Sequence, residues 1–108
     1  MSDVCYSIRP LTNNDLVAVS VLESQLFSHP HSVAQLQSMT SEPYLAIVIE
    51  QNCHVAGYAI AAFGGGEADL LVIAVDKPLR GTGAASCLLS ELLDRLKQRG
   101  VERLFLEV

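Results

Sequence analysis

The sequence has no tryptophan, and only three of its 108 residues are cysteine. Cys5, Cys53 and Cys87 are odd in number and lack metal-ligand spacing, which argues against a disulfide framework and against a zinc site. The three histidines are not at metal-ligand spacing either, so no metal site is predicted. We expect reduced thiols in a cytoplasmic protein, with Cys87 packed as a small hydrophobic side chain.

Basic side chains are scarce as well. Seven Lys and Arg stand against twelve Asp and Glu, which gives a net charge of -5. Non-specific nucleic-acid binding needs a clustered basic surface, so a nucleic-acid partner is not expected. No run approaches the roughly 20 apolar residues of a membrane span, and the N-terminal residues lack the basic and apolar regions of a signal peptide. We therefore expect no membrane partner.

Hydrophobic residues make up 50% of the chain. A chain of this size and composition can bury more than half of its unfolded surface, so we expect one domain over residues 1–108. Apolar periodicity and turn residues predict the order β-α-α-β-β-β-α-β, an α/β class with a mixed sheet. The expected strands are 5–10, 44–50, 54–63, 67–76 and 101–108, and the expected helices are 12–28, 33–39 and 81–99.

Several local features of these elements are predicted. Thr12 with Asp15 is expected to form a capping box, and Ser32 is expected to cap the second helix. Gly57 is expected to mark a bulge or a close backbone approach. The strand 67–76 is nearly all apolar from Leu70, which is typical of a strand covered on both faces. The expected buried stripe of the last helix is Ala84, Ala85, Leu88, Leu89, Leu92, Leu93 and Leu96.

The chain is organised around the junction between the apolar strand and the last helix. Gly81 and Gly83 leave room for a ligand against the backbone, because glycine has no Cβ. The amides in the first turn of a helix lack internal partners, and the helix dipole favours negative charge there. The junction is therefore predicted to bind a phosphate group, although a tight strand-to-helix connection would use the same residues.

The same glycines, with Ser86, also imitate a dinucleotide-binding fingerprint in which Glu107 would hold the ribose. A Rossmann glycine follows its strand almost at once, whereas residues 77–80 intervene here, and an antiparallel hairpin precedes the motif. The dinucleotide interpretation is the poorer of the two.

Residues 76–85, read D-K-P-L-R-G-T-G-A-A, resemble the acetyl-CoA signature of the GNAT N-acetyltransferases. The core of that signature is Arg or Gln, two residues, Gly, one residue, and then Gly or Ala; here these positions are Arg80, Gly83 and Ala85. Other stretches resemble the family's opening (8–12), its signature strand (67–76), and the helix exit and next strand of the RimI-type ribosomal-protein alanine N-acetyltransferases (97–101 and 104–108). The resemblance covers the whole chain in order and implies the GNAT acyl-CoA N-acyltransferase fold.

The resemblance also implies the chemistry. Acetyl-CoA would be the co-substrate, and a primary amine, such as the N-terminal α-amine of a ribosomal protein, would attack the thioester directly. Glu107 would be the general base that removes the proton of the amine, and Glu67 would help to hold the acceptor. The residues implied to bind the cofactor are Ile73, Ala74, Val75, Arg80, Gly81, Thr82, Gly83, Ala84 and Ala85.

The sequence departs from the family pattern at its end. The family continues past the fifth strand into a further helix and hairpin that carry an Asn and a Tyr, and nothing follows Val108 here. We therefore expect a fold truncated after the fifth strand, with an open edge that favours a homo-oligomer. An alternative function is a non-catalytic CoA-binding or assembly module, or a fragment that is inactive without its C-terminal segment.

Overall fold

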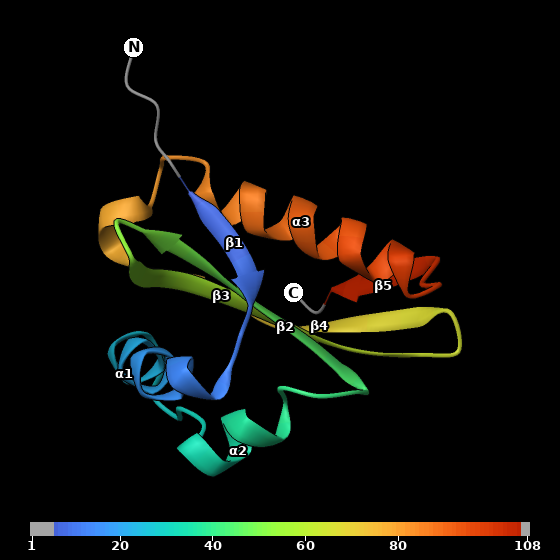
Figure 1. Ribbon diagram of the computed structural model, residues 1–108, viewed down its shortest axis with the longest axis horizontal. Coiled ribbons are helices and arrows are strands. Elements are labelled where there is room, and N and C mark those ends of the chain that lie inside the picture. Colours follow the sequence, from blue (N-terminus) through green and yellow to red (C-terminus); the bar gives the residue numbers. More distant parts are fainter. Residues whose placement is uncertain (1–5, 107–108) are drawn as a thin grey trace.

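The computed structural model describes residues 6–106 as one five-stranded sheet with helices against both faces (Figure 1). Helices α1 and α2 lie against one face of the sheet, and α3 lies against the other (Figure 1). The strands are β1 (Ser7–Pro10), β2 (Tyr44–Gln51), β3 (His54–Gly64), β4 (Glu67–Val75) and β5 (Arg103–Leu106). The helices are α1 (Leu16–Leu26), α2 (Val33–Ser38) and α3 (Ala84–Gln98), with short 3-10 turns η1 (Asn13–Asp15) and η2 (Lys77–Leu79).

The strands lie in the sheet in the same order as in the chain, β1 to β5. The first four pair antiparallel, and β4 pairs parallel with β5 through the α3 crossover. The predicted element order and the mixed sheet are confirmed. A sheet that is antiparallel in all but one pair is not the doubly wound parallel sheet of a dinucleotide-binding fold, so the dinucleotide interpretation is wrong.

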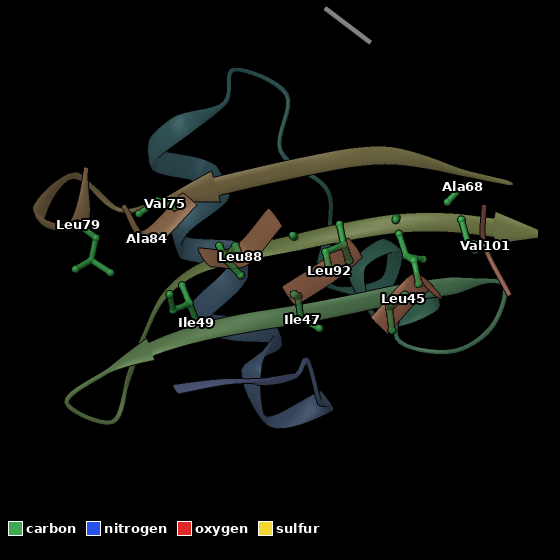
Figure 2. Packing of buried hydrophobic residues seen from close by; sticks show 13 residues of the cluster. Leu45, Ile47, Ile49, Ala68, Val75, Leu79, Ala84, Leu88, Leu92 and Val101 are labelled. Carbon is green, nitrogen blue, oxygen red and sulfur yellow. The ribbon is translucent and has the colours of Figure 1, made fainter. Parts of the chain in front are cut away.

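Helix α3 packs on the sheet through a single row of residues four apart. Ala84, Leu88, Leu92 and Leu96 are buried in one cluster with apolar residues of the central strands. Figure 2 shows Leu88 and Leu92 over the strands that carry Ile49, Ile47 and Leu45. Because residues at i and i+4 lie one above the other along a helix, this row forms one continuous ridge. The ridge fixes the height of α3 above β4 and thus the place of its first turn.

The predicted stripe of α3 was too wide. Ala85 and Leu93 are exposed, and Cys87, which was expected to be packed, is exposed as well. The reason is geometric: within the described residues only the sheet covers α3, and a sheet on one side buries a single ridge. The side chains of α3 on either side of this ridge therefore point along the flanks of the helix or into solvent.

Gly57 marks both features that the sequence suggested. The pairing of β2 and β3 shifts register at Ile49 and Glu50, and a Cβ on Gly57 would lie 2.7 Å from the carbonyl oxygen of Ala74. Real Cβ atoms do not approach other atoms so closely, so the sheet requires glycine here.

Strand β4 contains a second irregularity. Ile60 pairs with Val72 while Ala61 pairs with Leu70, which leaves Leu71 without a partner on β3. Leu71 is 49% exposed, so the prediction that both faces of β4 are covered is wrong at this position. A bulge bends its strand and increases its twist. We therefore expect β4 to bend at Leu71, in the middle of the strand.

The predicted caps are present. The Asp15 carboxylate accepts hydrogen bonds from the backbone N–H of Thr12 at 2.8 Å and from its hydroxyl at 3.1 Å. The Ser32 hydroxyl accepts from the Gln35 N–H at 3.1 Å. Val33 is 42% exposed, because α2 has only about two turns and packs through Leu36.

Strand β5 begins at Arg103, two residues later than predicted, and the predicted residues 107–108 lie outside the described part of the chain. Among residues 6–106 it pairs only with β4. A homo-oligomer formed through its outer edge stays a prediction. No helix in the described part of the chain is long and apolar enough to cross a membrane.

Candidate functional site

The connection from β4 to α3 is a tight, ordered turn. Asp76 ends the strand and accepts a hydrogen bond from the backbone N–H of Lys77 at 2.8 Å, which starts η2. Gly81 and Gly83 then adopt φ values of 78° and 88°. Only glycine takes this left-handed conformation without cost, so the two glycines allow α3 to begin immediately after the turn.

The first turn of α3 presents free donors. Within residues 6–106, the backbone N–H groups of Gly81, Gly83, Ala84 and Ala85 donate to no backbone carbonyl, and the first bond into the helix runs from Cys87 to Gly83. These groups carry the positive end of the helix dipole. The arrangement is that of an anion-binding helix start.

Thr82 differs from its neighbours. Its N–H donates to the carbonyl of Leu79 at 3.3 Å, and its hydroxyl donates to the same carbonyl at 2.5 Å. The Tyr6 hydroxyl donates to the Thr82 hydroxyl at 2.6 Å. Thr82 therefore closes the turn that sets up the free amides.

The end of β4 has an open edge on the side away from β3. Pairing with β5 stops at Leu70 and Leu106, the last described residue. The N–H of Asp76 points to β3, where it donates to the carbonyl of Ala56 at 2.8 Å. Because backbone polar groups alternate between the two edges of a strand, those of Ile73 and Val75 face the open edge, and Arg80 Nε lies 3.4 Å from the Val75 carbonyl oxygen.

A cavity of about 350 Å³ lies between this open edge and the start of α3. It brings together five of the residues that the sequence assigned to the cofactor: Ile73, Ala74, Val75, Arg80 and Ala85. Its opposite wall is formed by Leu26 and Phe27, at the end of α1. No sequence signal marks this wall, because apolar residues at helical spacing are usually part of a core.

The two acidic candidates lie elsewhere. Glu67 begins β4 and lies six residue steps, roughly 20 Å along an extended strand, from Ile73. Glu67 lines a separate hollow of about 280 Å³ that includes Asp69 and Phe105. Glu107 lies outside the described residues. Both assignments therefore stay predictions.

A third carboxylate, Glu23 on α1, is only 1% exposed. It accepts a hydrogen bond from the Tyr58 hydroxyl at 2.5 Å and one from the His31 backbone N–H at 2.7 Å. Burial, and then the hydrogen bond to Glu23, raise the pKa of Tyr58 well above its ordinary value. Glu23 thus joins Tyr58 of β3 to His31 of the segment between α1 and α2.

Residues 6–106 contain no group of three or more His, Cys, Asp or Glu side chains that could hold a metal ion.

Comparison with known proteins gives a consistent result. Residues 13–108 match the acetyltransferase (GNAT) family. The chain is 36% identical over 102 residues to the ribosomal protein bS18-alanine N-acetyltransferase of Escherichia coli K12, covering 94% of this chain and 69% of that protein. It is 34% identical over 87 residues to the corresponding enzyme of Haemophilus influenzae, covering 81% of this chain and 60% of that protein.

Solved structures agree. The crystal structure of the Escherichia coli ribosomal-protein-S18-alanine N-acetyltransferase superimposes with a TM-score of 0.87 at 36% identity, over 96% of this chain and 67% of that one. The PaiA N-acetyltransferase of Thermoplasma acidophilum, crystallised with coenzyme A, gives a TM-score of 0.87 at 16% identity, over 96% of this chain and 79% of that one. At that identity the likeness concerns the fold.

Proposed function

The chain belongs to the acetyltransferase (GNAT) family, and we propose from this membership that it transfers the acetyl group of acetyl-CoA to the N-terminal α-amine of a protein. The acceptor class comes from its relatives, which are named as ribosomal protein bS18-alanine N-acetyltransferases. Such an acceptor places the reaction in the cytoplasm. The observation that carries the proposal is the open edge of β4 beside the free amides of α3.

The start of α3 fits a pyrophosphate. Four free N–H groups and the helix dipole can hold its oxygens, and Arg80 adds a guanidinium at the cavity wall. A side chain at Gly83 would stand beside these amides in open space, because nothing lies within 4 Å of the place a Cβ would take there.

The open edge of β4 fits the pantetheine arm, which carries two amide groups. The main-chain groups of Ile73 and Val75 can bond to those amides as they would to a neighbouring strand. A backbone N–H near the bulge can stabilise the negative charge that develops on the acetyl oxygen. The thioester would then point toward the place where β4 and β5 separate.

The chemistry needs a base and no covalent enzyme intermediate. Acetyl-CoA supplies the thioester; the amine nitrogen forms a bond to the acetyl carbon while the carbon–sulfur bond breaks and the thiolate takes up a proton. An α-amine is largely protonated near neutral pH, so a carboxylate must remove its proton. We assign this role to Glu107, and we assign to Glu67 the role of holding the acceptor, as the family resemblance implies.

The test is a calorimetric titration with acetyl-CoA, followed by an assay for free CoA thiol with and without a peptide that begins with alanine. We expect saturable binding and thiol release that depends on the peptide. Binding without thiol release would favour a non-catalytic CoA-binding module, and absence of binding would contradict both functions.

A further inference from the structure

Glu23 is a buried carboxylate that the proposed chemistry does not use. It lies on the inner face of α1 beside Val19 and Leu22, and its side chain is 1% exposed. A buried carboxylate costs several kcal/mol unless hydrogen bonds compensate for the lost water. Among the described residues no Lys or Arg pairs with it, so its compensation comes from Tyr58 and His31.

The donors to Glu23 come from two different elements. Tyr58 lies on β3, and its hydroxyl donates to one carboxylate oxygen at 2.5 Å. His31 lies between α1 and α2; its backbone N–H donates to the other oxygen at 2.7 Å, and its Nδ1 lies 3.1 and 3.2 Å from the two oxygens. One carboxylate therefore ties α1, the sheet and the following loop together.

Glu23 also holds the start of that loop. Its backbone carbonyl accepts the N–H of Phe27 at 2.8 Å, which ends α1. Its side chain holds His31, four residues further along. The turn 27–31 is thus fixed at both ends by a single residue.

Glu23 joins the end of α1 to the sheet, and these two elements form opposite walls of the cavity. Leu26 and Phe27 form one wall. Tyr58 pairs directly with Ala74, which belongs to the other wall. The bond from Tyr58 to Glu23 therefore sets the separation between the end of α1 and the open part of β4.

We propose that Glu23 is a positioning residue that, through Tyr58 and His31, holds the Leu26–Phe27 wall against β4 and thereby shapes the acceptor side of the cavity. The inference rests on the proposed acetyl transfer. A displaced wall would hold the acceptor less well, which raises its KM, and a misplacement of about 1 Å relative to the thioester carbon costs as much as 100-fold in rate. Glu23 itself does not line the cavity and makes no hydrogen bond to the start of α3, so we expect the Kd for acetyl-CoA to change little when Glu23 is replaced.

The decisive variant is Glu23→Gln, which keeps the shape of the side chain but replaces one acceptor oxygen with an NH2 group that cannot accept from Tyr58 or His31. We expect kcat/KM for the acceptor peptide to fall about 10-fold to 100-fold, mainly through KM, with the Kd for acetyl-CoA within about twofold. Tyr58→Phe removes one donor and His31→Ala leaves the backbone donor in place, so both are expected to have smaller effects.

Asp15→Asn is the matched control, because Asp15 is also a buried carboxylate at the start of α1 but pairs with Arg9, away from the cavity. It is expected to lower stability without raising the acceptor KM. Amide hydrogen exchange at Phe27 and His31 gives a second readout: Glu23→Gln should speed exchange there, and Asp15→Asn should not.

The outcomes separate the two proposals. If wild-type protein binds acetyl-CoA but transfers nothing to any amine, the proposed function fails, while the exchange data still report whether Glu23 holds the wall. If transfer proceeds and Glu23→Gln leaves the acceptor KM unchanged, or raises it no more than Asp15→Asn does, the positioning role is overturned. Unchanged exchange at Phe27 and His31 would overturn it as well.

Discussion

Gly57 and Ala74 lie so close across β3 and β4 that a Cβ on Gly57 would come within 2.7 Å of the Ala74 carbonyl oxygen and within 2.9 Å of Ile49 Cγ2. Ala74 lines the cavity. The contact therefore couples the packing of the sheet to the strand that the proposed cofactor would meet.

Gly57→Ala tests this contact. The methyl group must push β4 or Ile49 aside, so we expect a loss of about 1–3 kcal/mol in the free energy of unfolding together with weaker acetyl-CoA binding. Urea denaturation and calorimetry measure the two effects. Gly64→Ala is the control, because nothing lies within 4 Å of a Cβ there, and it should leave both quantities nearly unchanged. Equal effects at the two glycines would show that the close approach does not matter.

Gly83→Val is expected to abolish measurable acetyl-CoA binding. Its side chain would occupy the space in front of the free amides, and its φ of 88° would be strained by about 1–2 kcal/mol. Gly100→Val provides the comparison, since Gly100 has φ 82° and open space around it but lies at the other end of α3. Circular dichroism should show both variants folded. If the Gly83 variant still binds as wild type does, the pyrophosphate lies elsewhere.

Arg80→Ala is expected to weaken acetyl-CoA binding about tenfold, because it removes a cation from the cavity wall. Arg80→Lys should recover part of the loss. Salt screens charges that are open to solvent, so the difference between wild type and Arg80→Ala should shrink as ionic strength rises. Lys77→Ala removes an exposed charge on the same connection and should change affinity little. A similar loss in both variants would indicate a general charge effect.

Asp15 gives the fold a specific acid sensitivity. Its hydrogen bonds to the Arg9 guanidinium hold the pKa of Asp15 at about 2, below its ordinary value of 3.8. The unfolded chain takes up this proton first as pH falls, so the pair stabilises the fold above about pH 4 and loses its contribution as pH falls toward about 2. A shift of this size corresponds to about 2 kcal/mol.

Urea denaturation of wild type and Asp15→Asn measures that contribution. The stability difference between them should be about 2 kcal/mol smaller near pH 2 than at neutral pH. A difference that does not change with pH would mean that Arg9 does not hold the carboxylate.

Much of this architecture could be predicted because its signals are local. Gly100 with φ 82° ends α3, Asp15 and Ser32 cap the helices, and the alternation of the strands sets their boundaries to within a few residues. The glycine junction before Ala84 could be found for the same reason, since strand, turn and helix start are contiguous in the chain.

The remaining features depend on contacts between distant parts of the chain. Nothing near Phe27 indicates that it faces β4, and nothing near Glu23 indicates a partner 35 residues away. The exposure of Cys87 and Leu93 depends on how many layers cover α3. The bulge at Leu71 depends on the register of β3 with β4. Sequence periodicity describes one element at a time and contains none of this information.

The residues that line the cavity come from two separate stretches of the chain. Its cofactor side comes from one uninterrupted stretch, residues 73–85, while its opposite side comes from the end of α1, half a chain earlier. The first side relies on main-chain groups and on glycine, which leave little freedom to mutate, whereas the second relies on ordinary apolar side chains. If the chain transfers acetyl groups as proposed, substitutions at residues 26–31 would alter the acceptor side of the cavity and leave the main-chain groups of residues 73–85 in place.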